Sequence, residues 1–320
     1  MVTPQFMISS PRAIIERGQL VRDLDKDDTL IFLTDVQTTS DARKFQVTKV
    51  TSKKFIDDLN SHLCDKNNSS VLFFVPDDGT ELDEVISQCE KLQRSVRSTV
   101  IPCIYTHHDR TFFSLMKGAN QSHHGKYSRR TTRSLGSKIT KIADGINFPL
   151  NILAVGYGAQ VLSRLKDLKL TSKEPIFSNL FLAAPALAAD FFANKEQSGD
   201  SERGIQATNF FRRVHVFYDK DDKVLRRYSE GLEIENGIEV GLMGSTRPPD
   251  EIFGRLNCNR FAFWEDPYRH HIYFQCKKCL DYIDINLATC KLKDINHHDN
   301  FASNFYAARS EERRVGKECW

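Results

Sequence analysis

Short hydrophobic runs alternate with longer amphipathic segments between about residue 69 and residue 286. The runs are rich in β-branched or aromatic residues, which is typical of strands buried on both faces of a parallel sheet. The segments between them place apolar residues at three- and four-residue spacing, which predicts helices with one buried face. The predicted strands are VLFFV (71–75), TVIPCIY (99–105), LNILAV (150–155), NLFLAA (179–184), VHVFY (214–218) and RFAFW (260–264), and the predicted helices cover residues 81–97, 127–146, 159–168 and 222–229.

Strands that alternate with helices in this way predict an α/β domain, in which right-handed crossovers connect the strands of a mainly parallel sheet. Residues 1–68 are more polar, and only one strand (29–34) and one helix (53–63) are predicted there. We therefore expect an N-terminal extension, residues 1–68, that packs on an α/β domain of residues 69–308. A chain of this length is ample for a single large core.

The last residues of the chain, 309–320, are treated separately. Residues 309–319 read RSEERRVGKEC, which resembles the frame translation of a short-read sequencing adapter. Segments of this kind are excluded from fold reasoning. We therefore interpret residues 309–320 as an artefact and expect the natural sequence to continue differently after Ala308.

Charge and composition narrow the classes of partner. A formal net charge of +3 gives no electrostatic argument for nucleic acid binding. No apolar stretch reaches the length of a membrane span, and the N-terminus lacks the apolar core of a signal peptide. Seven scattered cysteines remain when the eighth, in the adapter-like tail, is set aside, and an odd number does not indicate a disulfide framework. The expectation is a soluble, cytoplasmic protein.

The chemistry of an open parallel sheet is expected at the carboxyl ends of its strands. The strand at residues 150–155 is followed by Gly156-Tyr157-Gly158 and then a predicted helix, which is the context of a nucleophile elbow. The strand at 214–218 is followed by acidic residues, and the strand at 260–264 by a segment with two histidines. The chain order of nucleophile position, acid and histidine is that of α/β-hydrolases.

Four segments make this resemblance specific. Residues 70–287 resemble a family of predicted α/β-hydrolases of unknown function with lipase-like elbows, often found in bacteria. The family's patterns Leu-Ala-His-Ser-Met-Gly-Asn, Leu-Ala-Ala-Pro-Asp-x-x-Ala-Asp-x-Phe, Asn-Asp-x-Ala-Leu and Gly-His-Ser-Tyr-Phe are similar to LAVGYGA (153–159), LAAPALAADFF (182–192), DDKVL (221–225) and HHIYF (270–274). The resemblance implies the α/β-hydrolase fold, with a mainly parallel central sheet flanked by helices. It also implies that Asp222 takes the position of the catalytic acid and His271 that of the base.

The chain departs from the family where catalysis would begin. The nucleophilic serine of the family falls on Gly156, which has no side chain to attack a substrate. The family's oxyanion-hole loop falls on residues 76–79, so Asp77 and Tyr157 take the oxyanion-hole positions. Carboxylates at this loop would repel an oxyanion, and the loss of one donor there costs on the order of 10²–10³ in rate.

Other residues are weaker candidates for the site. Pro76, Asp78, His107 and His108 are expected to line the former cleft. Cys276 and Cys279 are spaced like zinc ligands, but three-residue spacing in a helix is ordinary packing, and we expect no metal and no cofactor.

Several alternatives stay open. A sequence error could have changed a serine codon, although Val155, Ala159 and the loop at 76–79 depart from the family as well. Glycine also suits the positive φ of an elbow, where any side chain is strained. Tyr157 is a poorly placed substitute nucleophile. An aspartate at the start of a helix is also typical of an N-terminal cap, and a histidine before an apolar helix is also typical of core packing.

The leading hypothesis is therefore a catalytically degenerate α/β-hydrolase-fold protein that binds a small molecule or a protein at the former active-site cleft. The alternative is an active ester or acyl hydrolase with a non-standard or mis-sequenced nucleophile. A third hypothesis is a scaffold whose function lies on residues 1–68. Neither a nucleic acid nor a membrane is expected as a partner.

Overall fold

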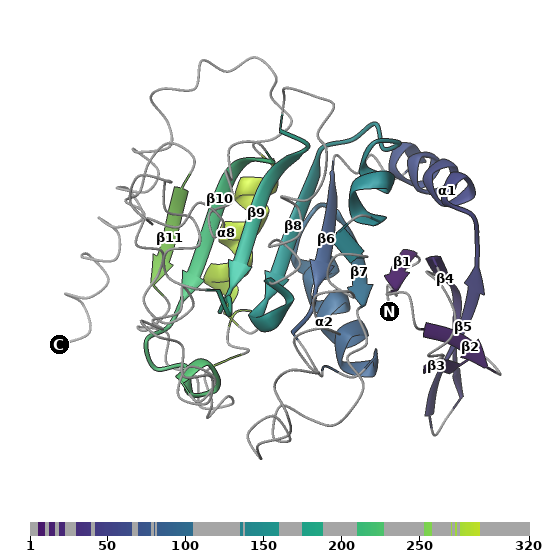
Figure 1. The fold of residues 1–320 in the computed structure, drawn as a ribbon, viewed down its shortest axis with the longest axis horizontal. Coiled ribbons are helices and arrows are strands. Elements are labelled where there is room, and N and C mark those ends of the chain that lie inside the picture. Colours follow the sequence, from purple (N-terminus) through teal and green to yellow (C-terminus); the bar gives the residue numbers. More distant parts are fainter. Residues whose placement is uncertain are drawn as a thin grey trace, which may run out of the picture. The chain divides into compact units, whose positions relative to one another are not determined.

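A computed structural model describes residues 6–9, 13–16, 19–22, 30–39, 42–65, 70–77, 80, 82–104, 135–136, 138–159, 175–187, 210–226, 253–257, 270, 273 and 276–288. Within these residues, nine strands form one sheet (Figure 1). They are β1 (Phe6–Ser9), β4 (Leu30–Thr39), β5 (Ala42–Lys49), β6 (Val71–Val75), β7 (Thr99–Ile104), β8 (Leu150–Val155), β9 (Phe177–Ala183), β10 (Phe211–Tyr218) and β11 (Phe253–Asn257). Two further strands, β2 (Ala13–Glu16) and β3 (Gln19–Arg22), form a separate antiparallel hairpin.

The order of the strands in the sheet is β11-β10-β9-β8-β6-β7-β1-β4-β5. Neighbours are parallel from β11 through to β1, whereas β4 and β5 run antiparallel. Strand β6 lies between β7 and β8, because the chain moves from β6 to one side for β7 and then crosses to the other side for β8. In open α/β sheets such a change of direction opens a crevice at the carboxyl ends of the strands, which is where ligands bind.

Most of the predicted strands are confirmed, and one is not tested. The runs at 71–75 and 150–155 are β6 and β8, and every residue of both strands is buried. Strands β7, β9 and β10 cover the runs at 99–105, 179–184 and 214–218 with small shifts at their ends. The strand beside β10 is β11, which precedes the predicted run at 260–264, and that run lies outside the described residues.

Helices cover both faces of the sheet, so the described part of the domain has three layers. One face carries α1 (Ser52–Asp65) and a helical segment at residues 135–143, against inward side chains such as Phe73 and Ile152. The other face carries α2 (Leu82–Ser95) and α8 (Lys277–Ala288), against Phe74 and Leu153. Neighbouring strand residues therefore enter opposite cores, as the two-residue period of a strand requires.

Helix α1 shows how the sequence determines one of these elements. The hydroxyl of Thr51 accepts a hydrogen bond from the backbone N–H of Lys54 at 3.2 Å and caps the helix. Phe55, Leu59 and Leu63 follow at four-residue spacing, and all three are fully buried. The predicted helices at 53–63 and 81–97 are confirmed as α1 and α2. The helix predicted at 159–168 lies outside the described residues apart from Ala159, and the one at 222–229 is described only to residue 226.

The N-terminal segment contributes strands to the same sheet. Strand β1 pairs in parallel with β7, with Ile8 opposite Cys103, and antiparallel with β4. Phe6 and Phe55 make an edge-to-face ring contact within the core on the α1 face. The division of the chain at residue 68 stays a prediction, but strand pairing and core packing both cross it. No helix in the described part of the chain has the length and apolar composition needed to cross a membrane.

A chain of buried polar side chains crosses the sheet beneath α8. His215 on β10 contacts the Tyr282 hydroxyl through Nδ1 at 2.9 Å and the Asn179 Oδ1 through Nε2 at 3.1 Å. Asn179 in turn donates to Asn151 Oδ1 at 2.8 Å, and Asn151 donates to the backbone carbonyl of Val71 at 3.1 Å. These bonds satisfy polar groups that would otherwise be costly to bury, and they fix how α8 lies on the sheet.

Replacing Tyr282 by phenylalanine should therefore lower the free energy of unfolding by about 1–2 kcal/mol, because His215 loses a partner in a buried position. The measurement is urea denaturation followed by circular dichroism, with an unchanged dependence of the free energy on urea concentration. A loss well below this range would show that the hydroxyl of Tyr282 contributes nothing to holding α8.

Candidate functional site

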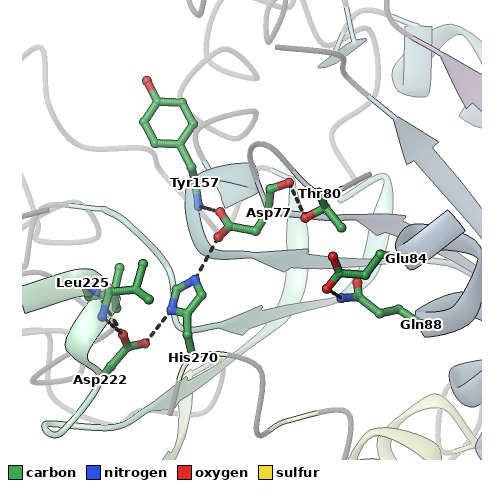
Figure 2. Close-up of polar contacts among 9 residues, drawn as sticks. Asp77, Thr80, Glu84, Gln88, Tyr157, Asp222, Leu225 and His270 are labelled. Carbon is green, nitrogen blue, oxygen red and sulfur yellow. Dashed lines mark hydrogen bonds and ion pairs between the residues drawn. The ribbon is translucent and has the colours of Figure 1, made fainter. Parts of the chain in front are cut away.

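The carboxyl ends of β6, β8 and β10 bring together the residues that were predicted to carry chemistry. Asp77 follows β6, Gly156 follows β8 and Asp222 follows β10. These three strands are parallel and belong to one sheet, so their ends meet at one edge. His270, which precedes α8 in the chain, completes the group (Figure 2).

Gly156 has the backbone geometry of a nucleophile elbow. Its φ is +52°, in the left-handed region that glycine enters without steric cost. A short helical turn over residues 156–159 begins there, directly after β8. The Gly156 carbonyl accepts a hydrogen bond from the backbone N–H of Ala186 at 2.9 Å, which braces the turn against the end of β9. The strand and the sharp turn that were predicted are therefore present.

The carboxylate of Asp77 occupies the space beside Gly156 where a side chain would stand. A Cβ atom placed on Gly156 would lie 2.7 Å from Asp77 Oδ2 and closer still to Oδ1 and Cγ. Gly158 gives room in the same way, because a Cβ there would meet the backbone carbonyl oxygens of Pro76 and Val75, the latter at 3.0 Å. The two glycines of the turn thus allow the segment after β6 to lie against the elbow.

Both oxygens of the Asp77 carboxylate are hydrogen-bonded inside the site. The backbone N–H of Tyr157 donates to Oδ1 at 2.6 Å, and Nε2 of His270 lies 2.8 Å from Oδ2 (Figure 2). The hydroxyl of Thr80 donates to the Asp77 carbonyl at 2.9 Å and closes a local turn. The donor predicted for the oxyanion hole, Tyr157 N–H, is therefore already bonded to a carboxylate from the chain itself.

Asp222 serves two elements at once. Its Oδ2 lies 2.7 Å from Nδ1 of His270. Its Oδ1 accepts hydrogen bonds from the backbone N–H groups of Val224 and Leu225, each at 2.9 Å, and so caps the helical turn that starts at residue 223. Asp222 thus caps this helical turn and contacts His270 at the same time, and its position as a catalytic acid stays a prediction.

His270 lies between two carboxylates and is almost completely buried. Its side chain is 2% exposed, that of Asp222 is 0% exposed and that of Asp77 is 15% exposed. Burial by itself would lower the pKa of His270, but the charges and hydrogen bonds of Asp222 and Asp77 outweigh that effect and raise the pKa to about 10. The imidazole is therefore protonated at neutral pH, and both ring nitrogens act as donors.

The predicted base position, His271, lies outside the described residues, so its role stays a prediction. The neighbouring residue, His270, contacts Asp222 in the structure. Two adjacent histidines match the family's single histidine almost equally well. The contact of Asp77 with Gly156 was not predicted. Asp77 was expected at the oxyanion-hole position because of its place in the loop, but its side chain was not expected to fill the space beside Gly156.

The remaining predicted residues are only partly described. Pro76 is buried directly after β6, whereas Asp78, His107 and His108 lie outside the described residues. Cys276 and Cys279 are buried at the start of α8 and pack in the core on that face. Hydrogen bonding between the two thiols, together with burial, raises the pKa of Cys276. Across the described ranges, no group of three or more histidine, cysteine or acidic side chains is arranged so that it could hold a metal ion.

Comparisons with known proteins give the family. A family model described as "Alpha/beta hydrolase of unknown function" matches residues 51–240, which is more than half of the chain. No curated protein matches the chain.

Three solved structures illustrate the similarity at the level of the fold. The EstE5-PMSF structure is 12% identical, with a TM-score of 0.36, and the match covers 68% of this chain and 77% of that one. A proposed esterase from Staphylococcus aureus is 12% identical, with a TM-score of 0.38 and coverage of 78% and 81%. Esterase LipW from Mycobacterium marinum is 11% identical, with a TM-score of 0.36 and coverage of 70% and 73%.

Proposed function

The chain belongs to the family of α/β-hydrolases of unknown function, and on that premise we propose that it is a catalytically degenerate member of the family. The fold predicted from the sequence, the α/β-hydrolase fold, is confirmed by the family match and by the parallel sheet with its flanking helices. In this proposal the former active site binds a small molecule or a protein and does not hydrolyse an ester.

One observation carries the proposal: the carboxylate of Asp77 lies where the nucleophile and the oxyanion of a serine hydrolase would be. Gly156 offers no attacking group, and the Tyr157 N–H is bonded to Asp77 Oδ1. A substrate carbonyl would have to displace a negative charge in order to reach that donor. Since an oxyanion hole works by presenting donors to developing negative charge, an occupied hole gives no stabilisation.

The protonation state of His270 supports the same conclusion. A general base must accept a proton near the working pH, and its pKa should therefore lie close to that pH. The pKa of His270 is raised to about 10 by two flanking carboxylates, so the imidazole already carries its proton at neutral pH. The acid and base positions are thus retained as a closed set of ion pairs.

The arrangement also bears on the alternative of a sequence error at residue 156. A serine there would place its Cβ against the Asp77 carboxylate. The surrounding residues therefore suit glycine, which supports glycine as the natural residue at this position.

The proposal predicts that the full chain hydrolyses p-nitrophenyl butyrate no faster than its His270→Ala variant, to within a factor of about two. Loss of the acid of a working triad costs on the order of 10⁴ in kcat, and loss of its histidine on the order of 10⁶. The measurement is release of p-nitrophenolate at neutral pH, with His271→Ala as the matched control on the neighbouring residue. Turnover that disappears in His270→Ala and survives in His271→Ala would show that the site is an active hydrolase.

A second candidate function is favoured by the position of Asp77 itself. Its carboxylate is 15% exposed and lies 2.8 Å from His270 Nε2, so it is the described residue best placed to act as a non-standard nucleophile. Attack of one oxygen on an ester carbonyl would give an acyl anhydride on Asp77 and release the alcohol, which takes its proton from His270. Water would then hydrolyse the anhydride and return the proton.

Single-turnover hydrolysis in H₂¹⁸O tests this second candidate. If water attacks the Asp77 carbonyl carbon of the anhydride, mass spectrometry would find ¹⁸O in the Asp77 side chain, and Asp77→Asn would be inactive. Absence of the label in an active enzyme would exclude attack of water at that carbon, while retained activity in Asp77→Asn would exclude Asp77 as the nucleophile.

A further inference from the structure

Two donors at the former active site converge on a single carboxylate. The Tyr157 backbone N–H points at one oxygen of Asp77 at 2.6 Å, and His270 Nε2 points at the other at 2.8 Å. The bare Cα of Gly156 leaves the space that the carboxylate fills. Two separate donors for the two oxygens, beside a position without a side chain, are what a binding site for a carboxylate requires.

The donors and the acceptor differ in how firmly each is held. His270 is 2% exposed and is bonded through its other nitrogen to the fully buried Asp222. Tyr157 N belongs to the turn that Ala186 braces. Asp77, in contrast, follows the end of β6 and is the most exposed of the three side chains. The donors are therefore held by the domain on more than one side, whereas the Asp77 carboxylate is the part of the group that solvent reaches most.

We propose that Asp77 is an internal ligand of a carboxylate-binding site, and that an external monocarboxylate exchanges with it on His270 Nε2 and Tyr157 N–H. This inference rests on the proposed binding function and names the class of ligand. Exchange leaves the charge next to His270 unchanged, because one carboxylate replaces another. A dianion is disfavoured, since it would add negative charge close to Asp222, which already faces the other side of the imidazole.

An internal ligand competes with an external one at a high effective concentration, typically on the order of millimolar for short tethers. Removing the Asp77 carboxylate should therefore free the two donors and strengthen binding of an external carboxylate. We expect the apparent Kd for acetate to fall by about ten- to a hundredfold in Asp77→Ala relative to the unaltered chain.

The test is the melting temperature of the full chain as a function of sodium acetate concentration, with sodium chloride at equal ionic strength as the reference. A ligand that binds only the folded state raises the melting temperature in a saturable way. We expect Asp77→Ala to saturate at the lowest concentration and the unaltered chain to need at least about tenfold more. Adding His270→Gln to Asp77→Ala should abolish the acetate-specific shift.

The proposal is overturned if Asp77→Ala shows no shift beyond that of chloride, if the His270→Gln double variant keeps the shift, or if the unaltered chain shows no saturable response. Asp77→Asn provides a second test should Asp77→Ala fail to fold, because it keeps the shape and loses the charge. It should bind acetate more tightly than the unaltered chain, and equal affinity would contradict the exchange. Ester hydrolysis that depends on His270 would instead contradict the proposed function. The acetate titration would still test whether a carboxylate exchanges with Asp77.

Discussion

Substituting alanine for Gly156 should lower the free energy of unfolding by about 3 kcal/mol, and making the same change in an Asp77→Gly background should cost only about 1 kcal/mol. The smaller figure is the cost of placing a Cβ at a left-handed φ, which is +52° at this residue. The additional 2 kcal/mol or so is the cost of forcing the new methyl group against the Asp77 carboxylate. Asp77→Gly removes that carboxylate, so only the backbone cost remains.

The measurement is a double-mutant cycle by urea denaturation, with Gly156→Ala and Asp77→Gly studied singly and together. Gly158→Ala provides a matched control in the same turn. Its new Cβ would meet the backbone carbonyls of Pro76 and Val75, which Asp77→Gly leaves in place. Its cost should therefore be the same in both backgrounds. If Gly156→Ala also costs the same in both, the Asp77 carboxylate does not lie beside Gly156.

The second large effect is a dependence of folding stability on pH, with a maximum near pH 6.5 and a different histidine responsible on each side. His270 has its pKa raised from 6.5 to about 10, and His215 has its pKa lowered from 6.5 to about 3. Each group contributes a slope of up to about 1.4 kcal/mol per pH unit between its unfolded and folded pKa values.

On the alkaline side the folded state holds a proton that the unfolded state has released. Between pH 6.5 and about 10, His270 is protonated in the folded chain because Asp222 and Asp77 flank it, whereas in the unfolded chain it is neutral. The contribution of these ion pairs to the free energy of unfolding is therefore fully present below pH 6.5, and it is lost as the pH rises toward 10. The thiols of Cys89 and Cys103, whose pKa is raised by burial from 9.0, add to this loss only at the upper end of the range.

On the acid side the situation is reversed. Burial, and to a smaller extent the charge of Arg213, lower the pKa of His215 to about 3, so the folded chain keeps it neutral. The unfolded chain takes up the proton below pH 6.5. The contribution of the neutral His215 to the free energy of unfolding is therefore fully present above pH 6.5, and it is lost as the pH drops from 6.5 toward 3. The groups that face the ring, the Tyr282 hydroxyl and the Asn179 side chain, carry no charge that could compensate.

Urea denaturation at pH values from 5 to 8.5 checks both arms, with His270→Gln and His215→Gln as the paired variants. His270→Gln should flatten the dependence between pH 6.5 and 8.5 and leave the acid arm. His215→Gln should flatten the range from 6.5 down to 5 and leave the alkaline arm. A His270→Gln variant that keeps the full alkaline slope would show that the imidazole is not held between two charged carboxylates.

Most strands of the central sheet could be predicted from the hydrophobic pattern of the sequence, because they are buried on both faces. Strands β6 and β8 begin and end where predicted, because each is a short apolar run with every residue buried between two helical layers. Strands β1 and β5 were not predicted, since they lie in the more polar N-terminal segment where the apolar runs are weak. Strand β11 was not predicted, because its sequence, FGRLN, contains a glycine and two polar residues, and the strand predicted at 260–264 stays untested.

The candidate site shows a different limit of sequence reasoning. The elbow, the position of Asp222 and the approximate position of the histidine follow from motif spacing along the chain. The contact between Asp77 and His270 joins residues 193 positions apart, and the choice between His270 and His271 depends on a single residue of register. Contacts of that kind form only when distant segments meet at the edge of the sheet. The local pattern of hydrophobic and polar residues does not predict them.

The structure also changes how the scaffold hypothesis for residues 1–68 should be tested. Removal of this segment would take Phe55, Leu59 and Leu63 out of the core and leave β7 without its neighbour β1. Loss of partner capture after truncation would then report unfolding. Exposed positions on α1, such as Lys54 and Asp58, offer substitutions that leave the core intact.

The close approach of Asp77 to Gly156 also restricts the mutational routes that lead out of this sequence. A serine introduced at position 156 would collide with the carboxylate. Removal of the carboxylate alone would take from the buried His270 the anionic partner of its Nε2. Each single step therefore passes through a less stable protein, and only the two changes together restore the space for a serine. A chain with Asp77 and Gly156 therefore cannot gain a nucleophilic serine at position 156 by a single substitution without losing stability.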